Sequence, residues 1–294
     1  MSGRLLLCTD LDRTLIPNGP QAESPAARPL FEALVARPEI TLAYVSGRDR
    51  SLVEDAIGAY RLPCPDFVIA DVGSSIFSIG GMKEWRLDHA WTTEIAADWG
   101  DYDSAAVAGL LADLAELRLQ EPARQNRYKL SYYTPVEAEH GALAGSILKR
   151  LRSRGIQARL IWSVDRLANV GLLDVLPARA SKYHAIEALM RMQGFDCANT
   201  VFCGDSGNDL EVFASAIPSV VVANAPADVR KRASTEAKKA GHDAQLYVAR
   251  GGFLGMNGNY SAGMLEGIAH YQPQTIDWMS SLTARRRTDA TEGA

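Results

Sequence analysis

The sequence lacks any long hydrophobic run. Its longest apolar stretches cover only several residues, such as Pro218 to Ala225, whereas a helix that spans a bilayer needs about 20. The first apolar run, Leu5 to Cys8, is too short for the hydrophobic region of a secretory signal and leads directly into two acidic residues. We therefore expect a cytoplasmic protein that does not bind a membrane.

Cysteine and clustered basic charge are also scarce. The four cysteines, Cys8, Cys64, Cys197 and Cys203, include no CxxC pair, which argues against a zinc site. Cys8 and Cys203 lie in apolar runs, so we expect them to be buried free thiols. The formal net charge is −4, and the basic run at residues 285–287 stands alone in a polar tail. Nucleic acid is therefore not the expected partner.

The apolar segments alternate between strand-like and helix-like runs. With 294 residues and 47% hydrophobic residues, the chain can form one large domain or two modest ones. The alternation predicts an α/β fold with a doubly wound parallel sheet. The expected strands cover residues 4–9, 41–45, 67–72, 200–203 and 219–223, and the expected helices cover 29–36, 51–60, 181–192, 209–215 and 263–271.

The pattern changes between these two halves. Gly80-Gly81 is typical of a flexible break, and helices at 104–117 and 136–154 then alternate with strands at 128–134, 157–163 and 170–176. This order indicates an α+β unit inserted into the α/β fold. We therefore predict a catalytic core of residues 1–82 and 177–272, an inserted cap domain of residues 83–176, and a loosely ordered tail of residues 273–294.

Two carboxylates follow the first predicted strand. In an extended segment, residues two apart point the same way, so Asp10 and Asp12 can face one pocket. Carboxylates at close range repel each other and need a cation or a shared proton. Aspartate also forms aspartyl-phosphate intermediates. The pair suits a nucleophile beside a general acid, although a turn or helix cap at the strand end explains the same pattern equally well.

Two further polar positions lie at predicted junctions between strands and helices. Ser46 and Gly47 follow the second strand, where a hydroxyl and a backbone amide can hold a phosphoryl oxygen or simply cap the next helix. Lys182 lies in the first turn of a helix, where the helix dipole favours acids. Its ammonium group suits neutralisation of a phosphate and a nucleophilic carboxylate, and a solvated surface lysine is the alternative.

An acidic loop, GDSGND, follows the predicted strand at residues 200–203. Asp205, Asp209 and the amide of Asn208 suit a hard cation, and Mg²⁺ typically binds one or two carboxylates plus water and phosphate. An EF-hand calcium loop does not fit, because the position that needs Glu is Ala216. The four sets of polar residues are Asp10 with Asp12, Ser46 with Gly47, Lys182, and the loop at 205–209. Since they all lie at strand ends or at a helix start of one parallel sheet, we expect them to converge.

Together these sets resemble the motifs of the haloacid dehalogenase (HAD) phosphatase superfamily. The resemblance implies a Rossmann-like core and identifies the insertion as a type-2 α+β cap. A narrower resemblance, to sucrose-phosphate and mannosylfructose-phosphate phosphatases, runs to about Tyr271. The matching segments are DLDRT at 10–14, SGR at 46–48, ADVGSSI at 70–76, QNRYKLSY at 125–132, LLDVLP at 172–177, Lys182, CGDSGND at 203–209 and VANA at 222–225.

The resemblance implies a Mg²⁺-dependent phosphatase that works in two steps. Asp10 would attack phosphorus and become a phosphoaspartate, and Asp12 would protonate the leaving oxygen and later activate water. Ser46 and Lys182 would complete the catalytic set. The implied phosphate ligands are Ser46, Gly47, Lys182 and Asn208, and the implied metal ligands are Asp10, the Asp12 carbonyl, Asp205 and, through water, Asp209.

The cap is expected to select the sugar. We predict that Gln125, Tyr128 and Lys129 line the sugar pocket with Asn224, although an ordinary antiparallel strand with a solvated face gives the same pattern. The first-choice substrate is sucrose 6-phosphate. The alternatives are mannosylfructose-phosphate, another glycoside or sugar phosphate, and a broad range of sugar phosphates or nucleotides. A sucrose-phosphate synthase is the suggested protein partner, either of an active enzyme or of a non-catalytic phosphatase-like module.

Overall fold

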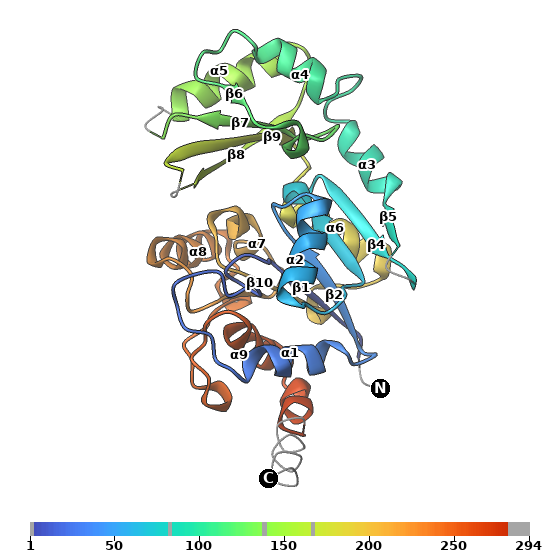
Figure 1. Ribbon diagram of the computed structural model, residues 1–294, viewed down its shortest axis with the longest axis vertical. Helices are drawn as coiled ribbons and strands as arrows, with labels where there is room; N and C mark the ends of the chain where they lie inside the picture. The colour runs from blue at the N-terminus through green and yellow to red at the C-terminus, as the bar shows by residue number, and fades with distance from the viewer. Residues whose placement is uncertain (1–2, 82–83, 137–139, 166–167, 282–294) are drawn as a thin grey trace.

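The computed structural model describes residues 3–81, 84–136, 140–165 and 168–281. In these ranges the strands form an eight-stranded sheet, ordered β12-β11-β10-β1-β2-β3-β4-β5, and a four-stranded sheet, ordered β6-β7-β9-β8. Figure 1 shows the small sheet and its helices above the large sheet. No helix in these ranges is both long and apolar enough to cross a bilayer.

The elements that the text uses have the following bounds. The strands are β1 (Leu5–Thr9), β2 (Ile40–Val45), β3 (Phe67–Ala70), β4 (Ser75–Ile79), β5 (Trp85–Leu87), β6 (Arg118–Leu119), β7 (Leu130–Thr134), β8 (Ala158–Asp165), β9 (Val170–Pro177), β10 (Thr200–Gly204), β11 (Ser219–Val221) and β12 (Leu246–Val248). The α-helices are α1 (Ala27–Val35), α2 (Arg50–Tyr60), α3 (His89–Ala96), α4 (Ser104–Leu111), α5 (His140–Arg152), α6 (Lys182–Gln193), α7 (Leu210–Phe213), α8 (Ala227–Ala240) and α9 (Ser261–Tyr271).

The large sheet is buried because helices cover both of its faces. Successive residues of a strand point to opposite faces, and every residue of β1 is buried. Leu5 and Leu7 pack in a cluster with α1, α2 and α9, whereas Leu6 and Cys8 pack in a second cluster with α6, α7 and α8. Strands β12 to β3 pair in parallel, and β4 and β5 are antiparallel additions. The predicted doubly wound α/β core is confirmed.

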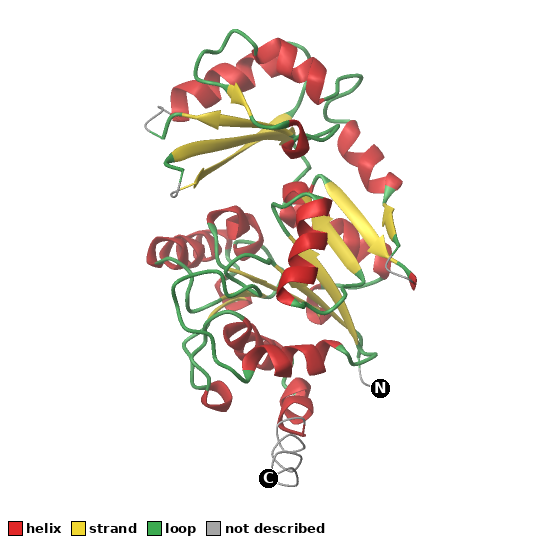
Figure 2. Cartoon of the chain, viewed as in Figure 1, coloured by secondary structure: helices red, strands yellow, loops and turns green. Residues whose placement is uncertain are grey.

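The small sheet forms the inserted α+β cap. Its strands pair antiparallel, and α4 and α5 cover its outer face (Figure 2). Leu130 and Tyr132 of β7 lie opposite Val175 and Leu173 of β9, and all four are buried. Their cluster continues through α3 into the core beneath. The cap and the core therefore share one apolar interior on this side of the molecule.

The domain boundary at residue 83 differs from the structure. Residues 80 and 81 lie at the turn of the β4–β5 hairpin, where the Gly80 amide donates to the Glu84 carbonyl over 2.8 Å. Strand β5 therefore extends the large sheet, although the prediction assigns it to the cap. A glycine pair suits a hairpin turn as well as a linker. The crossing to the cap comes after β5, and Pro177 on the return path is still the last residue of β9.

The tail prediction is wrong for the residues that the structure describes. Residues 274–281 are helical, Thr275 and Met279 are fully buried, and the Arg37 guanidinium lies 4.1 Å from the ring centre of Trp278. Met279 belongs to the apolar cluster of α1 and α9, and Trp278 packs against that cluster, so the segment is held on the core. Residues 282–294 lie outside the described ranges.

Candidate active site

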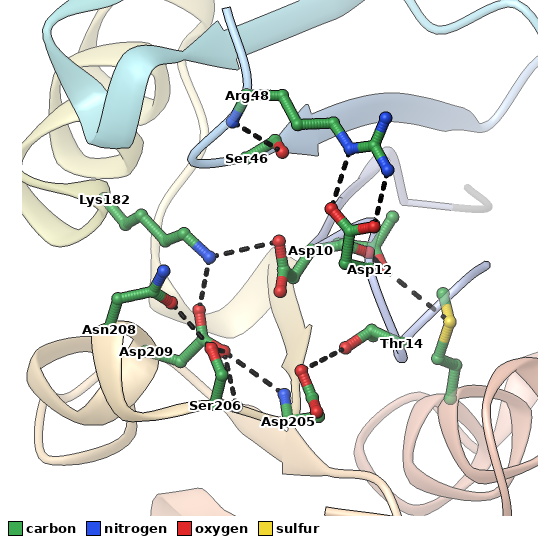
Figure 3. A network of polar contacts seen from close by, with 12 residues as sticks. Asp10, Asp12, Thr14, Ser46, Arg48, Lys182, Asp205, Ser206, Asn208 and Asp209 are labelled. Carbon is green, nitrogen blue, oxygen red and sulfur yellow. Dashed lines mark hydrogen bonds and ion pairs between the residues drawn. The ribbon is translucent and has the colours of Figure 1, made fainter. Parts of the chain in front are cut away.

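Three strand ends and one helix start meet at a single place (Figure 3). Asp10 follows β1, Ser46 follows β2, and the loop 205–209 follows β10, and these strands are neighbours with β1 in the middle. Lys182 is the first residue of α6, whose N-cap is Ser181. Parallel sheets bind ligands beyond the carboxyl ends of their strands, where the strand order reverses. The sets predicted from the sequence are brought together at that point.

Lys182 joins two buried carboxylates. Its Nζ lies 3.1 Å from Asp10 Oδ1 and 2.7 Å from Asp209 Oδ1. Burial raises the pKa of Asp10 well above its usual value, and Asp209 and Asp205 add to this effect while Lys182 opposes it. Burial also works against the Lys182 ammonium, but the two carboxylates outweigh it and raise the Lys182 pKa. Lys182 is therefore a permanent positive charge beside Asp10.

Asp10, Asp205 and Asp209 form a compact acidic cluster. Each offers a carboxylate oxygen within 4.8 Å of the other two. Burial, followed by repulsion from Asp209, raises the pKa of Asp205 to about 7. Asp209 already accepts hydrogen bonds from Lys182 and, over 2.9 Å, from the Ser206 amide, so Asp10 and Asp205 have more free oxygen capacity. Buried hard oxygens with excess negative charge fit Mg²⁺.

Asp12 points away from that cluster and is held by Arg48. Arg48 Nε donates to Oδ2 over 2.7 Å and Nη2 donates to Oδ1 over 2.6 Å, while Asn18 Nδ2 donates to Oδ1 over 2.7 Å. Burial alone raises the pKa of Asp12, but the hydrogen bonds and charge of Arg48 outweigh it and leave that pKa below its usual value. Asp12 is therefore ionised at neutral pH, and it must leave Arg48 before it can donate a proton.

Hydrogen-bond donors surround the other side of Asp10. Ser46 is buried, and its Oγ accepts a bond from the Arg48 amide over 3.1 Å. A Cβ built on Gly47 would lie 3.9 Å from Asn208 Nδ2, so these two residues face each other. Asn208 Oδ1 accepts a bond from the Ser206 hydroxyl, which leaves Nδ2 as a donor. Together with Lys182 Nζ, these groups can hold the oxygens of a phosphoryl group.

Comparison with known proteins agrees with this geometry. The family model for sucrose-6F-phosphate phosphohydrolase matches residues 3–272. The chain belongs to this family. It is a sugar-phosphate phosphatase with the HAD fold, and thus a phosphoric monoester hydrolase.

Its relatives include two kinds of disaccharide-phosphate phosphatase. A HAD-like hydrolase of Nitrosococcus oceani is 53% identical over 96% of this chain and 75% of its own length. Sucrose-phosphatase 1 of Nicotiana tabacum is 30% identical over 81% of this chain. The match covers 54% of that relative, so this chain spans about half of its length. Mannosylfructose-phosphate phosphatase of Agrobacterium fabrum is 30% identical over 75% of this chain and 83% of its own. The Synechocystis sucrose-phosphatase structure with sucrose and phosphate has a TM-score of 0.70 at 25% identity and covers 92% of this chain and 98% of that chain.

The cap residues predicted to bind sugar contact other groups of this phosphatase, and Lys129 joins the cap to the core. The Gln125 side chain bonds to backbone groups of β7. Tyr128 is buried and packs edge-on against Trp99. Lys129 Nζ lies 3.5 Å from Asp71 Oδ1 in a pair that is at most 9% exposed. These contacts explain the three residues without a ligand, and a direct contact with sugar stays a prediction.

Asn224 supports the loop that follows Asp12. Its Nδ2 donates to the Arg13 carbonyl over 2.6 Å, and its Oδ1 accepts from the Tyr260 amide over 2.7 Å. Both Arg13 and Tyr260 have positive φ, at 59° and 50°, a conformation that costs free energy for residues with side chains. Asn224 is buried and holds both segments in place. This role differs from the sugar contact that the sequence predicts for it.

Two cavities lie beside the phosphoryl-binding groups. The larger, of about 540 Å³, reaches Asp10, Asp12 and Gly47, and the smaller, of about 370 Å³, reaches Lys182. Residues of β8 from the cap and of α8 from the core line both of them. The sequence pattern predicts no ligand-binding role for β8 and no element over residues 226–250, which contain α8.

Proposed function

We propose that this protein is a Mg²⁺-dependent phosphatase of disaccharide phosphates, with sucrose 6-phosphate as its first substrate. The observation that carries the proposal is the buried Asp10 carboxylate, paired with Lys182 and open to a cavity at the sheet edge. The family match and the sucrose-phosphatases of Nicotiana and Synechocystis support this sugar. The Agrobacterium relative makes mannosylfructose-phosphate the second candidate.

In the first step an Asp10 oxygen forms a bond to phosphorus, and the bond from phosphorus to the sugar oxygen breaks in line with it. Lys182, Asn208 and the amide of Gly47 hold the other phosphoryl oxygens. This positioning and charge neutralisation are the main contributions that a protein makes to phosphoryl transfer. Mg²⁺, held by Asp10, Asp205 and the Asp12 carbonyl, would supply the remaining positive charge.

Asp12 handles the proton in both steps. It donates a proton to the leaving sugar oxygen, and it then takes one from the water that hydrolyses the phosphoaspartate. Arg48 holds the ionised form of Asp12, which is the form that the second step needs. Release from Arg48 is what would let Asp12 take up a proton before the first step. The Arg48 contact thus links the position of Asp12 to its charge.

Two measurements test the chemistry. Asp10→Asn keeps the shape of the side chain and removes the nucleophile, so phosphate release should fall at least about 10³-fold. Acid quench of the wild type during turnover should trap phosphate on the protein, and the variant should trap none. A matched control is Cys64→Ser, because Cys64 is exposed and lies away from both cavities. Unchanged turnover in Asp10→Asn would refute the mechanism, whereas a wild type without turnover would reopen the hypothesis of a non-catalytic module that binds a synthase.

A substrate panel tests the choice of sugar. Sucrose 6-phosphate, mannosylfructose-phosphate, glucose 6-phosphate and a nucleoside monophosphate are compared by kcat/KM with Mg²⁺ and with a chelator. We expect the two disaccharide phosphates to exceed the others at least tenfold and the chelator to abolish turnover. Equal activity on glucose 6-phosphate would refute the disaccharide proposal, and full activity without metal would refute the Mg²⁺ dependence.

A further inference from the structure

The position of the nucleophile determines where the leaving group must lie. In-line displacement places the leaving oxygen on the side of phosphorus opposite the attacking oxygen of Asp10. The sugar therefore extends from the phosphoryl site into the larger cavity, which reaches Asp10 and has a volume of about 540 Å³. That volume is within the usual range for ligand sites, roughly 300–1,000 Å³, and far exceeds one phosphoryl group.

Among the residues that the structure describes, two elements line this cavity away from the catalytic loops. One is β8 of the cap, through residues 162–164, and the other is the start of α8 with its N-cap, through residues 226, 228, 229 and 232. Asp228 and Arg232 lie one helical turn apart, so they lie on the same side of α8. The neighbouring Val229 and Ala233 are buried against the core. The helix therefore presents a carboxylate and a guanidinium to the cavity.

Arg232 also belongs to the second cavity, which contains Lys182 and Ser181. It therefore lies where the phosphoryl site opens toward the region of the leaving group. Asp228 lines only the larger cavity, one helical turn closer to the start of α8.

Both side chains are exposed, and neither forms a side-chain hydrogen bond or ion pair with the residues that the structure describes. Three other charged residues of α8 have partners in the protein: Arg230 donates to the Ala223 carbonyl, and Lys239 pairs with Glu236. A carboxylate accepts bonds from hydroxyls, and a guanidinium donates several in a fixed plane. Sugar rings carry neighbouring hydroxyls that match both groups.

We propose that Asp228 and Arg232 of α8 bind hydroxyl groups of the sugar leaving group. The catalytic core, and not the cap alone, then helps to select a large glycosyl phosphate. This inference rests on the proposed sugar-phosphatase function and adds to it two residues that determine specificity. Ser163 and Val164 of β8 line the same cavity from the cap side, so the sugar would lie between the two domains.

The test compares two substrates in single variants. Asp228→Asn and Arg232→Gln are assayed on the disaccharide phosphate that the wild type hydrolyses best and on p-nitrophenyl phosphate, which has no sugar. The measured ratio is kcat/KM for the disaccharide phosphate divided by kcat/KM for p-nitrophenyl phosphate. Each variant should lower this ratio about 10-fold to 100-fold, as expected for a lost hydrogen bond to a charged group. The loss should appear mainly in KM, because the contact exists before and during the reaction. Arg232→Lys should recover part of it.

Lys231→Gln is the matched control, because Lys231 is exposed on the same helix and lies outside both cavities. Its ratio should equal that of the wild type. An equal loss on both substrates in Arg232→Gln would mean that Arg232 binds phosphate, which overturns its assignment to sugar. Wild-type ratios in both variants would overturn the whole inference while leaving the phosphatase proposal intact. Absence of wild-type turnover on every disaccharide phosphate would instead refute the proposed function, and this inference with it.

Discussion

The nucleophile should reduce the stability of the metal-free protein. Asp10 is 5% exposed and lies among other buried carboxylates, with Lys182 as the ammonium beside it. We therefore expect Asp10→Asn, which abolishes turnover in the proposed mechanism, to make the metal-free protein more stable than the wild type. Such a trade-off between activity and stability is common where a site is built for a charged ligand.

The size of the effect follows from the distances. At an effective dielectric constant of about 20, two unit charges within 4.8 Å repel by at least about 3.5 kcal/mol. Asp10 faces two such neighbours, Asp205 and Asp209. The Lys182 ammonium, 3.1 Å from Asp10, attracts it by about 5 kcal/mol at the same dielectric constant. The balance is unfavourable by about 2 kcal/mol before desolvation is included. When the carboxylates of the site are all ionised, we expect Asp10→Asn to raise the free energy of unfolding by about 1–2 kcal/mol.

Urea unfolding in a chelator, followed at several pH values, measures this difference. The pKa of Asp10 is raised in the folded protein, whereas an unfolded Asp has a pKa of about 3.9. The folded wild type therefore keeps a proton that the unfolded chain releases, and its stability falls as pH rises from about 4 through the raised pKa. Asp10→Asn lacks this group. The gain in stability should be small near pH 5 and largest near pH 8.

Asp209→Asn is the contrasting variant. Asp209 is fully buried, and its two oxygens accept bonds from Lys182 and from the backbone amides of Asp205 and Ser206. An amide has one acceptor oxygen, so this variant should lose about 1–3 kcal/mol. Equal losses in Asp10→Asn and Asp209→Asn, at every pH, would show that the electrostatic reasoning for Asp10 is wrong.

Three further changes test other contacts. Arg48→Gln should let the pKa of Asp12 rise, because the guanidinium is the main group that holds it low. The kcat/KM profile covers the step in which Asp12 donates a proton, so its alkaline limb should move to higher pH, and an unmoved limb would contradict this role. Lys129→Met leaves the Asp71 carboxylate buried without its ion partner, so urea unfolding should show a loss of about 3 kcal/mol, and a variant as stable as the wild type would contradict the buried pair. Arg13→Gln removes a positive charge 3.5 Å from Asp205 Oδ2, so calorimetry should show Mg²⁺ binding about fivefold tighter, as for one partly exposed charge; weaker binding would place the metal elsewhere.

The sequence predicts the parts of the fold and site that depend on local patterns. Buried strands that end in acids or small polar residues can be recognised one by one, and a parallel sheet brings their ends together. Helix α8 was missed because its buried face carries only Val229 and alanines, a weak apolar signal. The contact between Arg48 and Asp12 joins distant segments and leaves no pattern in either. The alternating pattern around Lys129 predicts a polar strand face. It cannot show that the Lys129 ammonium is paired with the Asp71 carboxylate.

The position of β1 in the sheet has a consequence for how the chain folds during synthesis. Leu5 pairs with Ile40 of β2, but Leu6 also pairs with Thr200 of β10, which leaves the ribosome only after the entire cap. Closing so long a loop costs entropy and slows folding. A folded cap shortens the loop, because Arg179 binds Asp98 with both backbone and side chain and joins the two ends of the insertion. The nucleophile thus emerges early, and the acidic loop that completes its surroundings emerges late, so the active site is assembled only after the cap has been made.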